Sequence, residues 1–238
     1  MSSSIVVRAK TYREDLDFED CEGLGKYVRK LEITATRNAS QVGYLHGHIL
    51  LLGEAHKDQQ VRRLLECNDD FEDMLITLFK GRITQGSQGN LILNGFSESA
   101  CEAFVQGHMD VDKQQATIQG LGAKGDILLV EAVRVYEAFQ SQGIGTLLMD
   151  KLASCQKVAS TLYLKASPFR LETAGKTDEQ VKEKVEKLQR FYERFGFSRI
   201  PGTEKEMLTT PARMWATVNE RHAALGACNI STSSMAGP

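Results

Sequence analysis

A glycine-containing turn between an apolar segment and an amphipathic segment constrains the fold of this chain more than any other feature. Residues 127–135 (ILLVEAVRV) are rich in β-branched side chains and long enough for a buried strand. After the turn, apolar residues recur at helical spacing, at Ile144, Leu147, Leu148, Leu152 and Cys155. Gly143 and Gly145 therefore open a helix, whose first N–H groups are unpaired and carry a partial positive charge. Such a helix end favours an anion, so the junction predicts a site for a phosphate-bearing ligand.

The same residues allow other interpretations than a phosphate site. A strand–glycine–helix junction is also a common structural turn, and the string QSQGIG does not by itself decide between the two. A dinucleotide-binding fingerprint needs a third glycine, whereas here the helix continues through Met149. A P-loop is excluded because no lysine followed by serine or threonine comes after the glycines.

A second helix follows and ends in an aromatic and glycine pattern. Thr177 and Gln180 predict a capping box at its start, and Gly196 suits a left-handed cap at its end. Its apolar stripe consists of Val181, Val185, Leu188, Tyr192 and Phe195. Residues 161–166, between the two helices, are typical of another strand. The predicted order is strand, anion-binding turn, helix, strand, and a helix ending in FYERFGF.

This order, with its two motifs, resembles the GNAT superfamily of N-acetyltransferases over residues 126–200. The resemblance implies an α/β fold of the α+β kind, with a mixed, mostly antiparallel central sheet flanked by helices. In that fold two parallel strands splay apart to admit acetyl-CoA. We expect one acetyltransferase domain over residues 1–220, with its cofactor core at 126–200 and a helical or irregular insertion at about 55–125. Residues 221–238 are expected to form a flexible C-terminal tail, because the last of them are small and polar.

The resemblance also assigns the contacts to acetyl-CoA. The main chain of Val133, Arg134 and Val135 would bind the pantetheine arm as an added strand. The pyrophosphate would lie on the turn and the helix start, at Gln140, Ser141, Gln142, Gly143, Ile144, Gly145 and Thr146. Two positions depart from the family pattern: Gln140 stands where arginine is common, and Val185 stands where an asparagine often hydrogen-bonds the cofactor.

Glu131 and Tyr192 are the candidate catalytic residues. Acyl transfer needs a neutral amine and a protonated leaving thiolate. Glu131 is the candidate base, because it is the lone carboxylate of an apolar strand. Side chains two residues apart share a strand face, so Glu131 is expected on the same face as Val133, towards the acceptor end of the cleft. The alternatives are that Glu131 pairs with a buried basic residue or marks a solvated strand edge. Tyr192 matches the tyrosine that faces the CoA sulfur in many family members and acts as general acid; alternatively it is a core aromatic. Weaker candidates for the base are Asp126, Asp110 and Asp112.

Composition and charge are those of an ordinary globular protein. The chain of 238 residues is 42% hydrophobic and 25% charged, with a formal net charge of −2 and no apolar run of transmembrane length. Its 5 cysteines are scattered without a C-x-x-C pair, which favours a reducing compartment and no structural zinc. His46 and His48 are interpreted as surface or cleft imidazoles rather than a metal pair. We predict a cytoplasmic or nuclear location and no metal, nucleic-acid or membrane partner; a homodimer is left open.

The rest of the chain predicts a hairpin and a helical region. Strands are expected at residues 5–10, 31–36, 41–52, 91–93 and 116–118, and helices at 57–81. A last strand is expected near Met207 and over 213–218. We expect the insertion to lie over the acceptor side of the cleft; the alternative is a structural elaboration or a dimer surface.

The sequence therefore predicts a CoA-dependent N-acyltransferase that moves an acetyl group directly from acetyl-CoA to a primary amine. The amine belongs to a small molecule or a protein, and the sequence does not identify it because a fold does not fix a substrate. The alternative is a catalytically silent acyl-CoA-binding or regulatory module, which the presence of both Glu131 and Tyr192 disfavours. A dinucleotide-dependent oxidoreductase is disfavoured by the missing third glycine.

Overall fold

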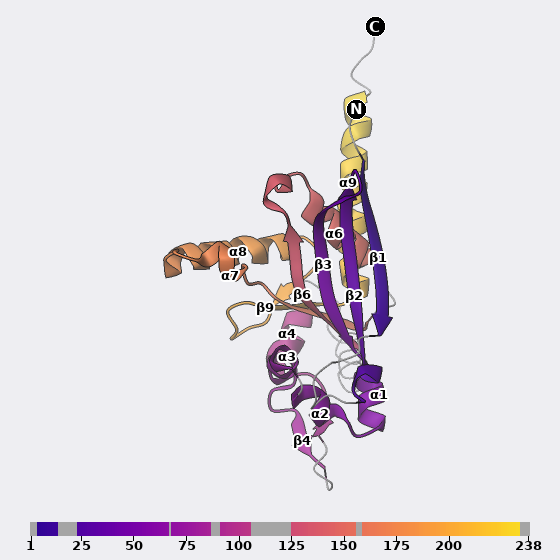
Figure 1. Ribbon diagram of the computed structural model, residues 1–238, viewed down its shortest axis with the longest axis vertical. Coiled ribbons are helices and arrows are strands. Elements are labelled where there is room, and N and C mark those ends of the chain that lie inside the picture. The colour runs from indigo at the N-terminus through magenta and orange to yellow at the C-terminus, as the bar shows by residue number, and fades with distance from the viewer. Residues whose placement is uncertain are drawn as a thin grey trace.

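A seven-stranded sheet organises the part of the chain that the computed structural model describes, residues 4–13, 23–66, 68–86, 91–105, 125–155 and 159–233 (Figure 1). In spatial order its strands are β1 (Ile5–Arg13), β2 (Val28–Arg37), β3 (Ser40–Leu50), β6 (Ile127–Val135), β7 (Thr161–Lys165), β9 (Glu206–Thr209) and β8 (Ser198–Arg199). Among these strands only β6 and β7 pair in parallel. The predicted fold class, a mostly antiparallel sheet flanked by helices, is confirmed.

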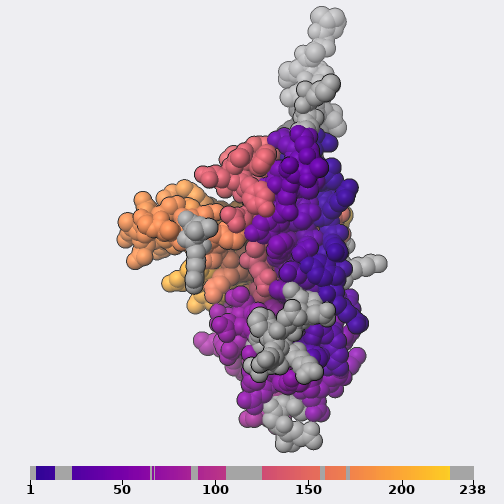
Figure 2. Space-filling view, in the orientation of Figure 1, coloured from indigo at the N-terminus to yellow at the C-terminus, as the bar shows by residue number. Residues whose placement is uncertain are grey.

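The predicted helices of the cofactor core are present. The helix α6 (Ile144–Ser154) buries Ile144, Leu148 and Leu152 against one face of the sheet. At the start of α8 (Asp178–Glu193), Thr177 Oγ1 accepts from the Gln180 N–H and the Gln180 side chain accepts from the Thr177 N–H. Figure 2 shows α8 (orange) standing out from the side of the molecule. Shorter elements are η2 (Gly25–Tyr27), η3 (Glu137–Phe139) and α7 (Arg170–Thr173).

The segment between β3 and β6 builds a second core at the lower end of the sheet in Figure 1. Its elements are α1 (Leu52–Lys57), α2 (Val61–Glu66), α3 (Asp69–Phe79), β4 (Ile83–Gln85), β5 (Leu91–Leu93) and α4 (Glu98–Val105). Their apolar side chains pack with Ile127 and Leu129 of β6, whereas Leu128 and Val130 face the α6 side. The predicted helices over 57–81 and the strand at 91–93 are confirmed, and the predicted strand at 116–118 lies outside the described residues.

The C-terminal segment differs from the sequence prediction. The strand near Met207 is β9, but the strand expected over residues 213–218 is wrong, because these residues belong to α9 (Pro211–Ser233). Pro211 occupies the first helical position, and Thr210 Oγ1 accepts from the Arg213 N–H at 3.2 Å, so two ordinary helix-start signals coincide there.

The helix α9 also continues past residue 220, where a flexible tail was expected. Met214 and Val218 are buried four residues apart against the α6 side of the sheet. One turn further, Arg221 pairs with Asp150 of α6, and its guanidinium lies 4.6 Å from the centre of the Phe195 ring. These contacts explain why the helix extends beyond the predicted boundary; residues 234–238 lie outside the described part.

We predict that truncating Leu148 destabilises the fold through the α6 contact with the sheet. Leu148 has no exposed surface, so Leu148→Ala should lower the free energy of unfolding by about 2–5 kcal/mol. Its neighbour Leu147 is 38% exposed, and Leu147→Ala is the matched control, with an expected loss of about 1 kcal/mol or less. Urea unfolding of both variants measures the difference. Equal losses would show that α6 does not pack on the sheet through Leu148.

Candidate functional site

The two parallel strands part at Glu131. β6 pairs with β7 from Ile127 to Val130 and then continues to Val135 without a β7 partner. On its other side β6 pairs with β3, and the register slips at the same point, because His46 faces Ala132 while Gly47 faces Val130. Glu131 is therefore the extra residue of a β-bulge. Beyond it, one edge of β6 lacks a strand partner among the described residues, and another extended chain can pair there.

Gly47 allows the two strands to approach at this bulge. A Cβ on Gly47 would lie 2.5 Å from the carbonyl oxygen of Leu129 and 3.0 Å from Cδ1 of Leu128. The first contact is with backbone, which cannot move aside without separating β3 from β6. We expected Glu131 and Val133 to share a face because side chains alternate along a regular strand. The bulge interrupts this alternation, but both residues line the same cavity.

The turn before α6 presents N–H groups that no side chain caps. Ser141 and Gly143 both have left-handed backbone, with φ of 60° and 77°. Gly143 is the N-cap of α6, no side chain hydrogen-bonds there, and the first turn contains no acidic residue. A helix start of this kind carries a partial positive charge and free donors. The predicted phosphate-binding turn therefore has the donors that a pyrophosphate requires.

A cavity of about 440 Å³ joins the open strand edge to this turn. Among its lining residues are Val133, Arg134, Val135, Gln140, Ser141, Gly143, Ile144, Gly145, Thr146, Phe169, Leu188, Phe191 and Tyr192. Nine of the ten predicted cofactor residues thus meet around one space, together with the predicted acid. The exception is Gln142, whose Oε1 accepts from Arg37 at 3.0 Å and whose Nε2 donates to the Ala138 carbonyl at 3.2 Å.

An adjoining cavity of about 400 Å³ contains the candidate base. Glu131 lines it with Asp70 of α3 and Lys165 of β7, so the insertion contributes one wall. The residues shared with the first cavity are Val133, Phe169, Glu172, Leu188 and Tyr192. Tyr192 therefore lies between the cofactor side and the Glu131 side of one continuous cleft.

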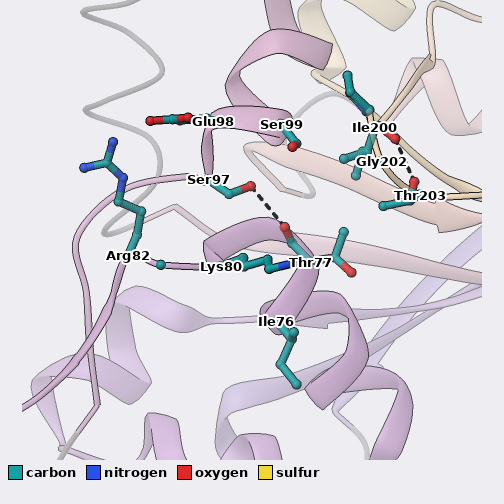
Figure 3. Close-up of a pocket in the computed structure, with 12 residues that line it drawn as sticks. Ile76, Thr77, Lys80, Arg82, Ser97, Glu98, Ser99, Ile200, Gly202 and Thr203 are labelled. Carbon is teal, nitrogen blue, oxygen red and sulfur yellow. Dashed lines mark hydrogen bonds between the residues drawn. The ribbon is translucent and has the colours of Figure 1, made fainter.

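A separate cavity of the described residues lies away from this cleft. It measures about 660 Å³ and is bounded by α3, the start of α4 and the turn at Ile200–Thr203, as Figure 3 shows. Lys80 and Arg82 line it, but none of the predicted site residues does. Within the described ranges no group of three or more His, Cys, Asp or Glu is placed to hold a metal ion, and no helix there could cross a membrane.

Glu131 is bound to a buried histidine. Its Oε1 lies 2.5 Å from Nδ1 of His48, a residue that is only 9% exposed. The His48 ring packs edge-on against Phe71 of α3, with ring centres 5.6 Å apart and planes at 73°. The contact matches one of the alternatives considered for Glu131, pairing with a buried basic residue. Glu131 nevertheless also lines the cavity. The sequence interpretation left His48 as a surface or cleft imidazole and did not pair it with Glu131, because only the β3–β6 register brings the two residues together.

Tyr192 has the surroundings of a core aromatic and also reaches the cleft. It is 7% exposed and packs against Phe191 and Phe197, with ring centres 5.2 and 6.0 Å away. Burial raises the pKa of the Tyr192 phenol above its ordinary value, so its hydroxyl stays protonated at neutral pH. The phenol is therefore available as a proton donor.

The weaker candidates for the base do not join this site. Burial raises the pKa of Asp126, which precedes β6 and lines neither cavity of the cleft. Asp110 and Asp112 lie outside the described residues. Among the carboxylates considered, Glu131 alone is placed on the cleft by the described structure.

Comparison with known proteins gave one family match and several structural matches. Residues 103–199 match the family model described as an acetyltransferase (GNAT) domain, and a search of curated proteins found no match. Among solved structures, Arabidopsis thaliana NAA60 with acetyl-CoA is 12% identical, with a TM-score of 0.33 over 76% of each chain. The same protein with a bisubstrate analogue is 12% identical, with a TM-score of 0.31 over 75% of this chain and 72% of that one. A bacterial toxin is 12% identical, with a TM-score of 0.39; the match covers 90% of this chain and 96% of the toxin chain.

We predict that Gly143→Val removes acetyl-CoA binding. Valine at a left-handed position is strained, and its branched side chain would obstruct the N–H groups of the turn. Affinity should fall more than about tenfold, because charge-assisted hydrogen bonds are each worth about 1.5–3 kcal/mol. Isothermal titration with acetyl-CoA measures the loss.

Gly202→Val is the matched control for backbone strain. Gly202 lies in the turn before β9 and has φ of 80°, and a Cβ added there would meet no atom within 4 Å, as at Gly143. Both variants should lose about 1–3 kcal/mol of stability, and only Gly143→Val should lose affinity. Parental affinity in Gly143→Val would place the phosphate site elsewhere.

Proposed function

We propose that this chain, a member of the GNAT superfamily, is a CoA-dependent N-acyltransferase that moves an acetyl group directly from acetyl-CoA to a primary amine. One observation carries the proposal: an open strand edge, an uncapped helix start and a buried tyrosine line the same cavity. The match of residues 103–199 to a GNAT domain supports it. The acceptor is proposed to be an amine-bearing small molecule or protein.

Recognition of acetyl-CoA would depend chiefly on main-chain groups. The pantetheine amides would pair with the edge of β6 at Val133–Val135, and the pyrophosphate would accept from the N–H groups at the start of α6. The guanidinium of Arg134 lies 5.2 Å from the centre of the Phe169 ring, and both residues line the cavity. This contact links β6 to the segment after β7 across the proposed pantetheine path.

The chemistry needs one proton removed from the acceptor and one delivered to sulfur. Glu131 takes a proton from the acceptor ammonium, and the neutral nitrogen then attacks the thioester carbonyl. The C–N bond forms and the C–S bond breaks, while the Tyr192 hydroxyl gives its proton to the departing sulfur. The nitrogen releases its second proton, which restores the phenol. The lining of the cleft supports Glu131 as the base and Tyr192 as the acid. Tyr192 lines both cavities, and Glu131 lines the one beside β7.

We predict that Tyr192→Phe lowers kcat by about 10²–10⁴-fold, the usual contribution of a general acid. The substitution keeps the ring that fills the core and removes only the hydroxyl, so stability should change little. Acetyl-CoA affinity should stay within a few-fold, because the proposed cofactor contacts lie on other elements. Release of free CoA in the presence of a panel of primary amines, together with acetyl-CoA titration, measures both quantities.

Tyr163→Phe is the matched control for loss of a buried phenol. Tyr163 is 2% exposed, lies on β7 and lines neither cavity, so its variant should keep the parental kcat. If Tyr192→Phe kept the parental kcat, Tyr192 would be a core aromatic and not the general acid. A parent that binds acetyl-CoA but releases no CoA with any amine would instead favour the silent acyl-CoA-binding module.

A further inference from the structure

Glu131 and His48 are in direct hydrogen-bond contact. Their facing atoms, Oε1 and Nδ1, are 2.5 Å apart, so a proton lies between them. With the carboxylate ionised, Nδ1–H donates to Oε1. The other carboxylate oxygen of Glu131 has no hydrogen-bond donor among the described residues. One oxygen is thus occupied by His48, and the second remains for a proton from the acceptor.

The surroundings of His48 fix the direction of its ring. Its strand neighbours are Lys30 on β2 and Leu129 on β6, and Phe71 of the insertion lies against the ring. The residue before it is Gly47, where an added Cβ would lie 2.5 Å from the carbonyl oxygen of Leu129. Backbone position and ring packing therefore both restrict His48, whereas the Glu131 side chain is 27% exposed at the cavity wall.

We propose that His48 is a positioning residue that holds the Glu131 carboxylate for proton transfer from the acceptor, and that the insertion supports it through Phe71. The inference rests on the proposed acyltransferase function. His48 acts through Glu131 and does not itself touch the acceptor. This proposal gives the insertion a role in the reaction, because Phe71 packs on His48 and its neighbour Asp70 lines the cavity, both at the start of α3.

Two nearly isosteric acceptors separate positioning of a base from general structural damage. Benzylamine is protonated at pH 7 and must lose a proton before it attacks, whereas phenylhydrazine is already largely neutral. Loss of the base should therefore slow benzylamine far more than phenylhydrazine. Damage to the cofactor site or the fold should slow both alike.

The experiment measures kcat/KM at pH 7 with both probes for the parent, His48→Leu, Glu131→Gln and the double variant. With benzylamine we expect Glu131→Gln to lose about 10²-fold or more, and His48→Leu to lose at least about tenfold. With phenylhydrazine each loss should be less than about fivefold. The double variant should be no slower than Glu131→Gln, because a residue that acts through another adds nothing once its partner is removed.

Two further variants complete the test. His48→Asn keeps an N–H donor close to the position of Nδ1 and should recover part of the benzylamine rate. His46→Leu is the matched control on the same strand, because His46 faces Ala132 across the ladder and stacks on Tyr44, with ring centres 4.4 Å apart. It should leave the benzylamine rate near that of the parent.

Equal losses with both probes, additive losses in the double variant, or no recovery in His48→Asn would each overturn the role of His48. A benzylamine loss in His46→Leu as large as in His48→Leu would do the same. A parent that releases no CoA with these probes or any other primary amine would overturn the proposed function itself, and the role of His48 with it. The two failures are therefore distinguishable.

Discussion

The bulge at Glu131 is the constraint on which the rest of the site depends. It occurs where β6 stops pairing with β7, so one extra residue both bends the strand and marks the end of the parallel pair. Beyond the bulge one edge of β6 is open to another extended molecule, and η3 and then the turn before α6 follow along the chain. A regular strand in place of the bulge would keep β6 in register with β3 and aim the Glu131 side chain differently. The open edge of β6 and the position of the Glu131 carboxylate thus share one structural origin.

The insertion is attached to this part of the sheet and is not a peripheral addition. Its core includes Leu129 of β6 and Tyr163 of β7, one residue from each parallel strand. In the first turn of α3, Asp70 lines the cavity and Phe71 packs against the ring of His48. Asn68 fixes this turn by accepting from the N–H groups of both residues, at 2.8 and 3.3 Å. These contacts support our expectation that the insertion lies on the acceptor side.

Features encoded by neighbouring residues were predictable from the sequence. The buried strand Ile127–Val135, the capping box of Thr177 and the left-handed Gly196, with φ of 83°, each follow from a local pattern of side chains. The pairing of His48 with Glu131 was not predictable in this way, because the two residues are 83 positions apart and only the β3–β6 register joins them. The helix α9 was missed although its start signals, Thr210 and Pro211, are local, because a last strand was expected over residues 213–218.

Backbone hydrogen exchange with and without acetyl-CoA tests the central claim most directly, that the cleft at the parting of β6 and β7 binds the cofactor. Saturating acetyl-CoA should slow exchange at residues 133–135 and 143–146, where we propose that the main chain pairs with pantetheine or faces the pyrophosphate. NAD at the same concentration should leave these amides unchanged, as should either compound around the large cavity at Ile200–Thr203. Protection around that cavity in place of the cleft, or equal protection of the cleft by NAD, would contradict the account.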